Sequence, residues 1–285
     1  MKTILFPTDF SQSTVAALNW ARLFARQYNA TLVVVHVQQL AIPDTTLPVA
    51  GELGMGSSAS LDLEPISHDQ LTKLAHQLQA EGINCQTDLL RGAVKEAILS
   101  AADTYNADLI ITGRGHLTNF FDRIVGTAAT SVARGANCPV LVVPARETEA
   151  AGHLAQLQTI VFTTPLEFDQ QETFGQVVEI ANTFGATLRV LRVQAENQPN
   201  INADEPLLQQ LQEAYGTAPL PVDTVDARTV SGGIETYLTT HPADLLVMTT
   251  RERDFLSGLL NPSLTDRMLT HLHIPVLVFH AETVL

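Results

Sequence analysis

The chain has 285 residues, of which 45% are hydrophobic and 16% charged, and a formal net charge of −14; this globular composition excludes disordered and fibrous classes. Two cysteines cannot by themselves form a disulfide framework or a zinc site, and the chain shows neither a signal-peptide pattern nor the ~20 apolar residues of a membrane span, so we expect a soluble cytoplasmic protein with no membrane partner. An acidic chain repels a phosphate backbone, so we also expect no nucleic-acid partner.

The predicted elements of the first half alternate between strand and helix. Short continuous apolar runs predict strands that are buried on both faces of a sheet, at Thr3–Pro7, Thr31–Val37, Ile83–Leu89, Leu109–Thr112 and Val140–Val143. Apolar residues at helical spacing predict amphipathic helices between them. The first helix has on one stripe Ala17, Leu18, Ala21, Phe24, Ala25 and Tyr28. The glycine- and serine-rich segment 51–60 predicts a mobile loop.

The second half of the chain repeats the first. Four blocks recur in the same order, at offsets of 156 and then 136 residues, and in the first half they are 4–11, 30–37, 107–111 and 139–142. A repeat of about 140 residues is far too long for a solenoid and indicates a duplicated domain. We place the two domains at residues 1–147 and 157–285.

The negative charge is concentrated in the second copy. Residues 1–147 carry 10 Lys and Arg against 13 Asp and Glu, whereas residues 148–285 carry 6 against 17. A polyanionic ligand such as a nucleotide would therefore meet less repulsion in the first copy.

Strand–helix alternation predicts the fold class α/β, with parallel strands covered by helices on both faces. Ligands of such sheets bind at the carboxyl ends of the strands, near the point where the strand order reverses. The segments to consider are therefore Pro7-Thr8-Asp9 after the first strand and Gly113 onward after the fourth.

The segment after the fourth strand has the features of a phosphate-binding loop. Gly113 and Gly115 come first, and Gly126 and Thr127 follow at the start of a predicted helix. The free N–H groups and positive dipole end of a helix favour an anion. Gly126 would let the backbone approach a phosphate closely, and Thr127 adds a hydroxyl donor.

On these residues the chain resembles the tandem two-domain form of the universal stress protein family. Nucleotide-binding members carry Pro-Thr-Asp after the first strand, and Gly-x-x-Gly, nine residues and Gly-Ser/Thr after the fourth. The residues in register with this pattern are Pro7, Thr8, Asp9, Gly113, Gly126 and Thr127. His116 stands where the second glycine is expected, with Gly115 beside it.

The resemblance implies two tandem Rossmann-like domains of the adenine nucleotide alpha hydrolase-like type, each a five-stranded parallel sheet with helices on both faces. Fifth strands pair across a dimer in single-domain relatives, so here the strands at Val140–Val143 and Val276–Phe279 are expected to pair with each other. The two domains would then form an internal pseudo-dimer with approximate two-fold symmetry.

The resemblance also implies that ATP, with or without Mg²⁺, is the cofactor. Asp9 and Val37 would flank the adenosine end and Gly126–Ala129 the phosphates, with positive charge from Arg114 or His116. The implied site residues are Pro7, Thr8, Asp9, Val37, Thr112, Gly113, Gly115, His116, Gly126, Thr127, Ala128 and Ala129.

The second copy lacks the nucleotide-binding features. Where the first copy has Asp9, Gly113 and Gly126, the second has Pro165, Thr249 and Pro262. A proline has no N–H to offer a phosphate and cannot adopt the glycine conformations. We therefore expect nucleotide in the first domain only.

Several residues also have a purely structural interpretation. Asp9 suits a helix-capping aspartate, and His116 a solvated loop residue. Three histidines, His271, His273 and His280, hint at a metal site but are more typical of a surface, and we expect no metal.

Two further motifs are expected to be structural. Ser231-Gly232-Gly233 resembles the phosphate loop of ATP pyrophosphatases, but it follows the third strand of its copy instead of the first, which favours a plain helix start. Cys138 precedes a buried strand and suits a packed thiol better than a nucleophile.

Three functions remain open. The leading hypothesis is a regulatory protein of the stress response that binds ATP or a related adenine nucleotide in its first domain and has an unidentified protein partner. The second is an interaction module that uses no nucleotide. The third is a slow ATPase, although the chain has no nucleophile elbow, HExxH or Walker A motif and no catalytic residue that we can name. A further homodimer is also left open.

Overall fold

The computed structural model describes residues 1–11, 14–38, 55–114, 128–145, 155–163, 171–196, 204–216, 218–250 and 264–280. The strands of the first half are β1 (Thr3–Pro7), β2 (Thr31–Gln38), β3 (Cys85–Arg91), β4 (Leu109–Arg114) and β5 (Val140–Pro144). Those of the second half are β6 (Thr159–Thr163), β7 (Thr187–Ala195), β8 (Val222–Ala227), β9 (Leu245–Thr250) and β10 (Val276–His280).

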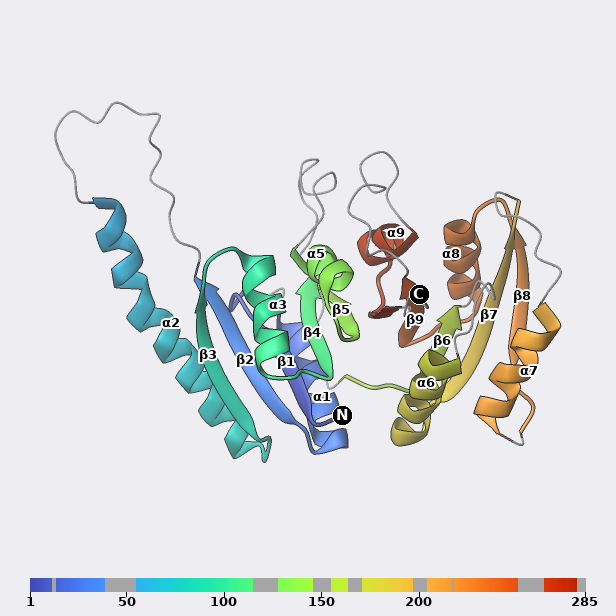
Figure 1. Ribbon diagram of the computed structural model, residues 1–285, viewed down its shortest axis with the longest axis horizontal. Coiled ribbons are helices and arrows are strands. Elements are labelled where there is room, and N and C mark those ends of the chain that lie inside the picture. Colours follow the sequence, from blue (N-terminus) through green and yellow to red (C-terminus); the bar gives the residue numbers. More distant parts are fainter. Residues whose placement is uncertain are drawn as a thin grey trace, which may run out of the picture.

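All of these strands join one ten-stranded sheet in the order β3-β2-β1-β4-β5-β10-β9-β6-β7-β8 (Figure 1). Within each half the neighbouring strands are parallel. The fold class and the five parallel strands of each half are therefore confirmed.

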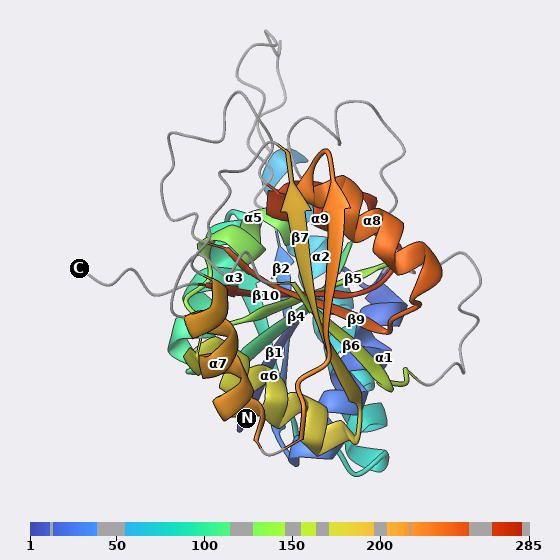
Figure 2. The same ribbon diagram turned by 90° about the vertical axis from the view of Figure 1, so that its right-hand side faces the viewer.

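Helices cover both faces of the sheet (Figure 2). One face is packed by α1 (Val15–Tyr28), α2 (Met55–Ala80), α6 (Gln171–Phe184) and α7 (Asp204–Tyr215). The other face is packed by α3 (Val94–Thr104), α5 (Ala128–Gly135), α8 (Val230–Thr240) and α9 (Leu264–His271). Each of the two core layers contains buried residues of both halves, so the hydrophobic core is continuous through the molecule.

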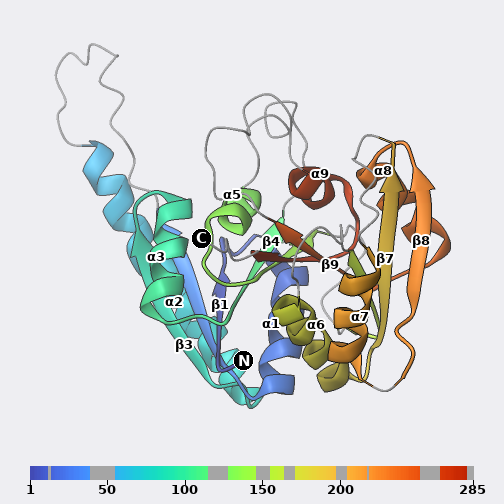
Figure 3. The ribbon, with the colours of Figure 1, turned by 45° about the vertical axis from the view of Figure 1, so that its right-hand side comes forward.

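The two halves meet edge to edge through their fifth strands, as expected. Strands β5 and β10 pair antiparallel, with Leu141 opposite Leu277. These two residues occupy the same position in the two copies, because 136 residues separate them. The approximate two-fold axis therefore passes between them, and the internal pseudo-dimer is confirmed. Figure 3 shows the strands and helices of the two halves side by side.

An aromatic contact supports this pairing on one face of the sheet. The rings of Phe24 on α1 and Phe184 on α6 lie 4.8 Å apart between centroids, and Tyr28 lies 6.0 Å from the same Phe184 ring. Gln27 donates its side-chain amide to the Thr183 carbonyl across the contact. Burial raises the pKa of Tyr28.

A repeated aspartate explains one of the repeated sequence blocks. The Asp108 carboxylate accepts the backbone N–H groups of Lys2 and Thr3, and Asp244 accepts those of Gln158 and Thr159. In each half this carboxylate joins the residue before the fourth strand to the start of the first strand. The bond therefore supports the register of the first strand against the fourth, which is β1 against β4 in the first half and β6 against β9 in the second.

The expected loop at residues 51–60 is partly wrong. Helix α2 already begins at Met55 and contains Pro65, whereas residues 51–54 lie outside the described residues. The buried residues Leu71 and Leu78 anchor this helix on the sheet. Extending a helix that already exists costs far less than nucleating one, so weak helix formers such as glycine and serine can continue it.

No helix in the described part of the chain is long and apolar enough to cross a membrane.

Candidate functional site

The candidate site lies where the strand order of the first half reverses. Strand β1 sits between β2 and β4. The helix after β1, α1, packs on one face of the sheet, and α5, which follows β4 along the chain, packs on the other. Connections that leave neighbouring strands toward opposite faces open a crevice at the carboxyl ends of the strands.

The turn after β1 is held by its own hydrogen bonds. The Thr8 N–H donates to the Val35 carbonyl at 2.9 Å, and the Thr8 hydroxyl accepts the Phe10 N–H at 3.0 Å. Phe10 has a φ of 58°, in the left-handed region that a non-glycine residue seldom adopts. The side chain of Asp9 is thereby presented at the exposed edge of the sheet.

Asp9 is not the cap of a helix. Its Oδ1 accepts the Ser11 N–H at 2.9 Å, while the N-cap of α1 is Thr14, five residues after Asp9. The helix-capping interpretation is therefore wrong, since the aspartate stabilises the turn and not the helix end.

A histidine on β2 supports the same turn and was missed from the sequence. The Nδ1 atom of His36 lies 2.8 Å from the Thr8 carbonyl oxygen, and its ring centroid lies 4.9 Å from that of Phe10. The one available signal was a polar residue near the end of an apolar run. Val37, the next residue, faces the opposite side of the sheet, because side chains alternate along a strand, and packs against the core there.

Strand β4 ends in Gly113 and Arg114, and the arginine has an unexpected partner. Thr112 is buried and Gly113 half-buried. Arg114 is only 8% exposed, and its guanidinium donates to the carbonyls of Thr270 and, at 2.7 Å, Leu272 in the second half. Burial lowers the pKa of Arg114.

The expectation that Arg114 supplies charge to phosphates is therefore wrong. The last carbonyls of a helix have no donor within the helix and face the negative end of its dipole. The end of α9 offers such carbonyls, and Arg114 binds them.

The structure places eight of the predicted site residues. Pro7, Thr8 and Asp9 follow β1, Val37 lies on β2, and Thr112 and Gly113 lie on β4, all near the carboxyl ends of three neighbouring strands. Helix α5 starts at Ala128, which is exposed, and Ala129 is buried. The other four, Gly115, His116, Gly126 and Thr127, lie outside the described residues.

The matching edge of the second half is built from other residues. Strand β9 has Thr249 where β4 has Gly113, so a side chain occupies the position that is bare in the first half. The Thr163 hydroxyl donates to the Val247 carbonyl at 3.3 Å between β6 and β9. Pro165 and Pro262 lie outside the described residues.

The glycine pair of the second copy is a helix start, as expected. The Thr229 hydroxyl caps α8 by accepting the Gly232 N–H at 3.2 Å. A Cβ atom at Gly233 would collide with Val193, so this glycine lets α8 pack closely on β7.

The three histidines and Cys138 show no sign of a metal site or of a reactive thiol in the described part of the chain. His271 and His273 are exposed, and His280 places Nε2 2.7 Å from the Ala133 carbonyl oxygen. Among the described residues no group of three or more His, Cys, Asp or Glu could hold a metal ion. Burial raises the pKa of Cys138 to about 12, which makes it a poor nucleophile.

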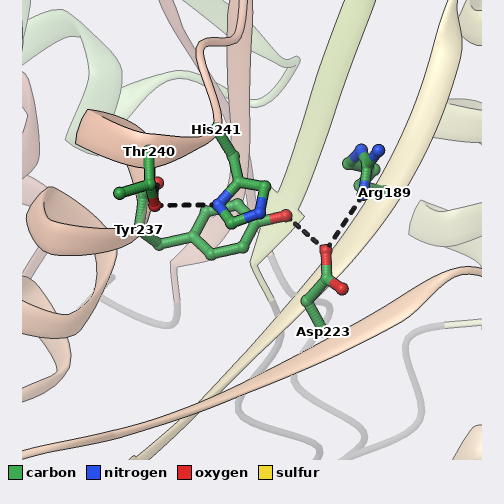
Figure 4. Close-up of polar contacts among 5 residues, drawn as sticks. All are labelled: Arg189, Asp223, Tyr237, Thr240 and His241. Atoms are coloured by element: carbon green, nitrogen blue, oxygen red, sulfur yellow. Dashed lines mark hydrogen bonds and ion pairs between the residues drawn. The ribbon is translucent and has the colours of Figure 1, made fainter.

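The second half also carries a polar network beneath α8 (Figure 4). The Tyr237 hydroxyl donates to Asp223, Arg189 pairs with Asp223 at 3.4 Å, and the His241 ring stacks on Tyr237 with centroids 4.3 Å apart. Burial, then the bond to Asp223, raises the pKa of Tyr237 to about 12. Such a phenol keeps its proton at neutral pH, so the network suits a structural role.

The first half makes a similar bond from the equivalent aspartate, although the two tyrosines stand at different positions of the repeat: Tyr105 corresponds to His241. The Tyr105 hydroxyl donates to Asp88 at 2.9 Å. Asp88 lies opposite Val35, and Asp223 lies opposite Leu191, which is the repeat equivalent of Val35. A tyrosine–aspartate bond that is present in both halves ties each outer strand to its helix, whatever either half binds.

Comparison with known proteins places both halves in one family. Residues 1–144 and 158–280 match the model of the universal stress protein family. Universal stress protein MJ0531 of Methanocaldococcus jannaschii is 29% identical over 142 residues, which are 50% of this chain and 81% of that protein. Universal stress protein A homolog 1 of Coxiella burnetii is 31% identical over 149 residues, or 51% and 98%.

A solved structure matches almost the whole chain. The universal stress protein from Archaeoglobus fulgidus aligns over 97% of this chain and 95% of its own, with a TM-score of 0.71 and 17% sequence identity. At this identity the likeness shows the fold alone. Since the family model covers both halves, the chain belongs to the universal stress protein family and carries two Usp domains in tandem.

Proposed function

We propose that the first half binds ATP or a related adenine nucleotide, and that the protein acts in the stress response as a nucleotide-dependent regulator. One observation carries the proposal: the Thr8–Asp9 turn and Gly113 lie on either side of the β1/β4 switch point, where open α/β sheets bind their ligands. The family resemblance points the same way, since nucleotide-binding members carry the Pro-Thr-Asp segment that is intact here at Pro7, Thr8 and Asp9.

The chemistry of the edge suits such a ligand. Asp9 is exposed and spends Oδ1 on the Ser11 N–H, which leaves its other carboxylate oxygen to accept a hydroxyl or amino group. Val37 offers an apolar surface to a base. The start of α5 at Ala128 presents the N-terminal end of a helix dipole, which suits a phosphate.

The two halves provide a matched test of the proposal. Gly113→Val places a branched side chain at the switch point of the first half, and Thr249→Val puts the same side chain at the equivalent position of the second half, where a branched residue already stands. We expect Gly113→Val to abolish ATP binding in calorimetric titration with Mg²⁺, and Thr249→Val to leave the Kd unchanged. Nucleotide should also be released on denaturing purified wild-type protein. Absence of binding by the wild type at millimolar ATP would refute the proposal.

A nucleotide-independent interaction module is the second candidate. The engagement of Arg114 with the second half favours it, because this cation is not available to phosphates. The same titration separates the two candidates, since a module of this kind gives no heat with ATP.

A further inference from the structure

Both elements that flank the proposed phosphate site are bonded to the second half of the molecule. Strand β4 reaches the carbonyls at the end of α9 through Arg114. Helix α5 reaches α9 through Arg134, which forms an ion pair with Asp266 and donates from Nε to Oδ1 at 2.9 Å. Gly113 directly precedes Arg114 on β4, and Arg134 lies in the last turn of α5, which begins at Ala128. The second half therefore contacts both elements that flank the proposed site.

A third bond fixes the far end of α5. The Ala133 carbonyl lies 2.7 Å from Nε2 of His280 on β10. Helix α5 is therefore held at its carboxyl end by the second half, while its amino end faces the carboxyl edge of the sheet (Figures 1 and 3). An eight-residue helix held in this way keeps a defined direction for its N–H groups.

Two of the groups that make these contacts are largely withdrawn from water, whereas the Arg134 side chain is 40% exposed. Arg114 is 8% exposed and Asp266 is 7% exposed. Hydrogen bonds with an ionised partner are the stronger ones, and a low-dielectric environment strengthens them further. Displacing either side chain would leave polar groups of the other half without their partners.

The two arginine contacts are not repeated at the equivalent positions of the second half. The repeat equivalents of Arg114, Arg134 and Asp266 are Thr250, Thr270 and Thr130. A threonine has neither the charge nor the reach of an arginine, so these positions of the second half cannot make the reverse arginine contacts. The charged arms start from the half that keeps Gly113, which is the half in which we propose nucleotide binding.

We propose that Arg114 and Asp266 are positioning residues of the nucleotide site: through them the second half holds β4 and α5 in the geometry that receives phosphates, and nucleotide in turn steadies α9. This inference rests on the proposed function. Binding free energies that are coupled are coupled reciprocally, so an effect of α9 on the site requires an effect of the site on α9.

The test measures ATP affinity and α9 dynamics on the full chain. We expect Arg114→Ala and Asp266→Asn each to raise the Kd for ATP with Mg²⁺ by about tenfold. Arg114→Lys should restore part of the affinity, because an ammonium group can still donate to one of the carbonyls. In wild type, ATP should slow amide hydrogen exchange over residues 264–272, and in Arg114→Ala it should not.

Gln27→Ala is the matched control. It removes a hydrogen bond between the same two halves, to the Thr183 carbonyl, but on the opposite face of the sheet. A general loosening of the interface would weaken ATP binding in this variant as well, whereas our inference predicts an unchanged Kd.

The possible failures are distinct. If wild type binds ATP and both Arg114→Ala and Asp266→Asn bind it equally well, with α9 exchange slowed in all three, this inference is wrong and the proposed function stands. If wild type binds no ATP, the proposed function is wrong, and the inference that rests on it is wrong as well. Should Arg114→Ala not fold, as judged by circular dichroism, Arg114→Lys and Asp266→Asn decide.

Discussion

The two halves agree where the fold is made and differ where a ligand would bind. Both have the aspartate that joins the first and fourth strands, Asp108 and Asp244, and both have a leucine at the two-fold axis. At the carboxyl edge, by contrast, the first half has Gly113 where the second half has Thr249. The residues that specify the fold and those that would specify a ligand are thus separate sets, and a copy can lose the second without the first.

The largest predicted effect concerns the shared core at the axis. Leu141→Ala and Leu277→Ala should each cost about 3 kcal/mol of unfolding free energy, because both side chains are fully buried and each truncation leaves a cavity. Since the core layer is continuous through both halves, we expect one transition in urea denaturation for both variants. Two separate transitions, or losses that differ severalfold, would break the equivalence of the halves.

A smaller effect is expected at the repeated aspartates. Asp108→Ala and Asp244→Ala each remove the acceptor of two backbone N–H groups, at a cost of about 1–2 kcal/mol. Thermal unfolding measures the loss, with Asp69→Ala as the control, because Asp69 pairs only with Lys73 on the exposed surface of α2. A loss in one half alone would show that the repeat is kept for another reason.

The smallest effect concerns the tyrosines that are bonded to aspartates of the outer strands, and it depends on pH. The pKa of Tyr237 is raised from 10.0 to about 12 in the folded state, so the unfolded chain loses this proton first. The resulting stabilisation is complete below pH 10 and is lost as pH rises toward 12. Denaturation between pH 9 and 12 should show this fall, and Tyr237→Phe should flatten it.

Tyr105→Phe sharpens the same comparison. The pKa of Tyr105 is also raised, by burial first and then by its bond to Asp88, so this variant should change the alkaline fall in the same direction. A fall that persists unchanged in the double variant would show that other groups cause it.

Much of the fold could be predicted because its signals are local. The run Thr3–Pro7 is apolar from Ile4 onward and becomes β1 with the same bounds. The stripe on the first helix is buried at Ala17, Ala21 and Phe24, although Trp20 belongs to it as well and was not included. Periodicity identifies a face, and a face contains every residue that points inward.

The site was predicted less completely, because its contacts join residues that are distant in sequence. Gly113 and Asp9 could be found from spacing and from family resemblance. Nothing local indicates that Arg114 would cross to carbonyls 156 and 158 residues away, or that His36 would hold the Thr8 carbonyl. A polar side chain at the end of a strand shows that a partner is needed, but the partner is defined only by the folded chain.

The antiparallel pairing of β5 and β10 within one chain also changes how such a protein can evolve and assemble. Two separate subunits joined at this strand would part on dilution, exchange with related subunits in the same cell, and carry identical sites encoded by one gene. In a single chain the partner is always present at high effective concentration. No subunit exchange can mix the pair, and each half accumulates substitutions on its own. One half can therefore become a dedicated support while the other keeps the site.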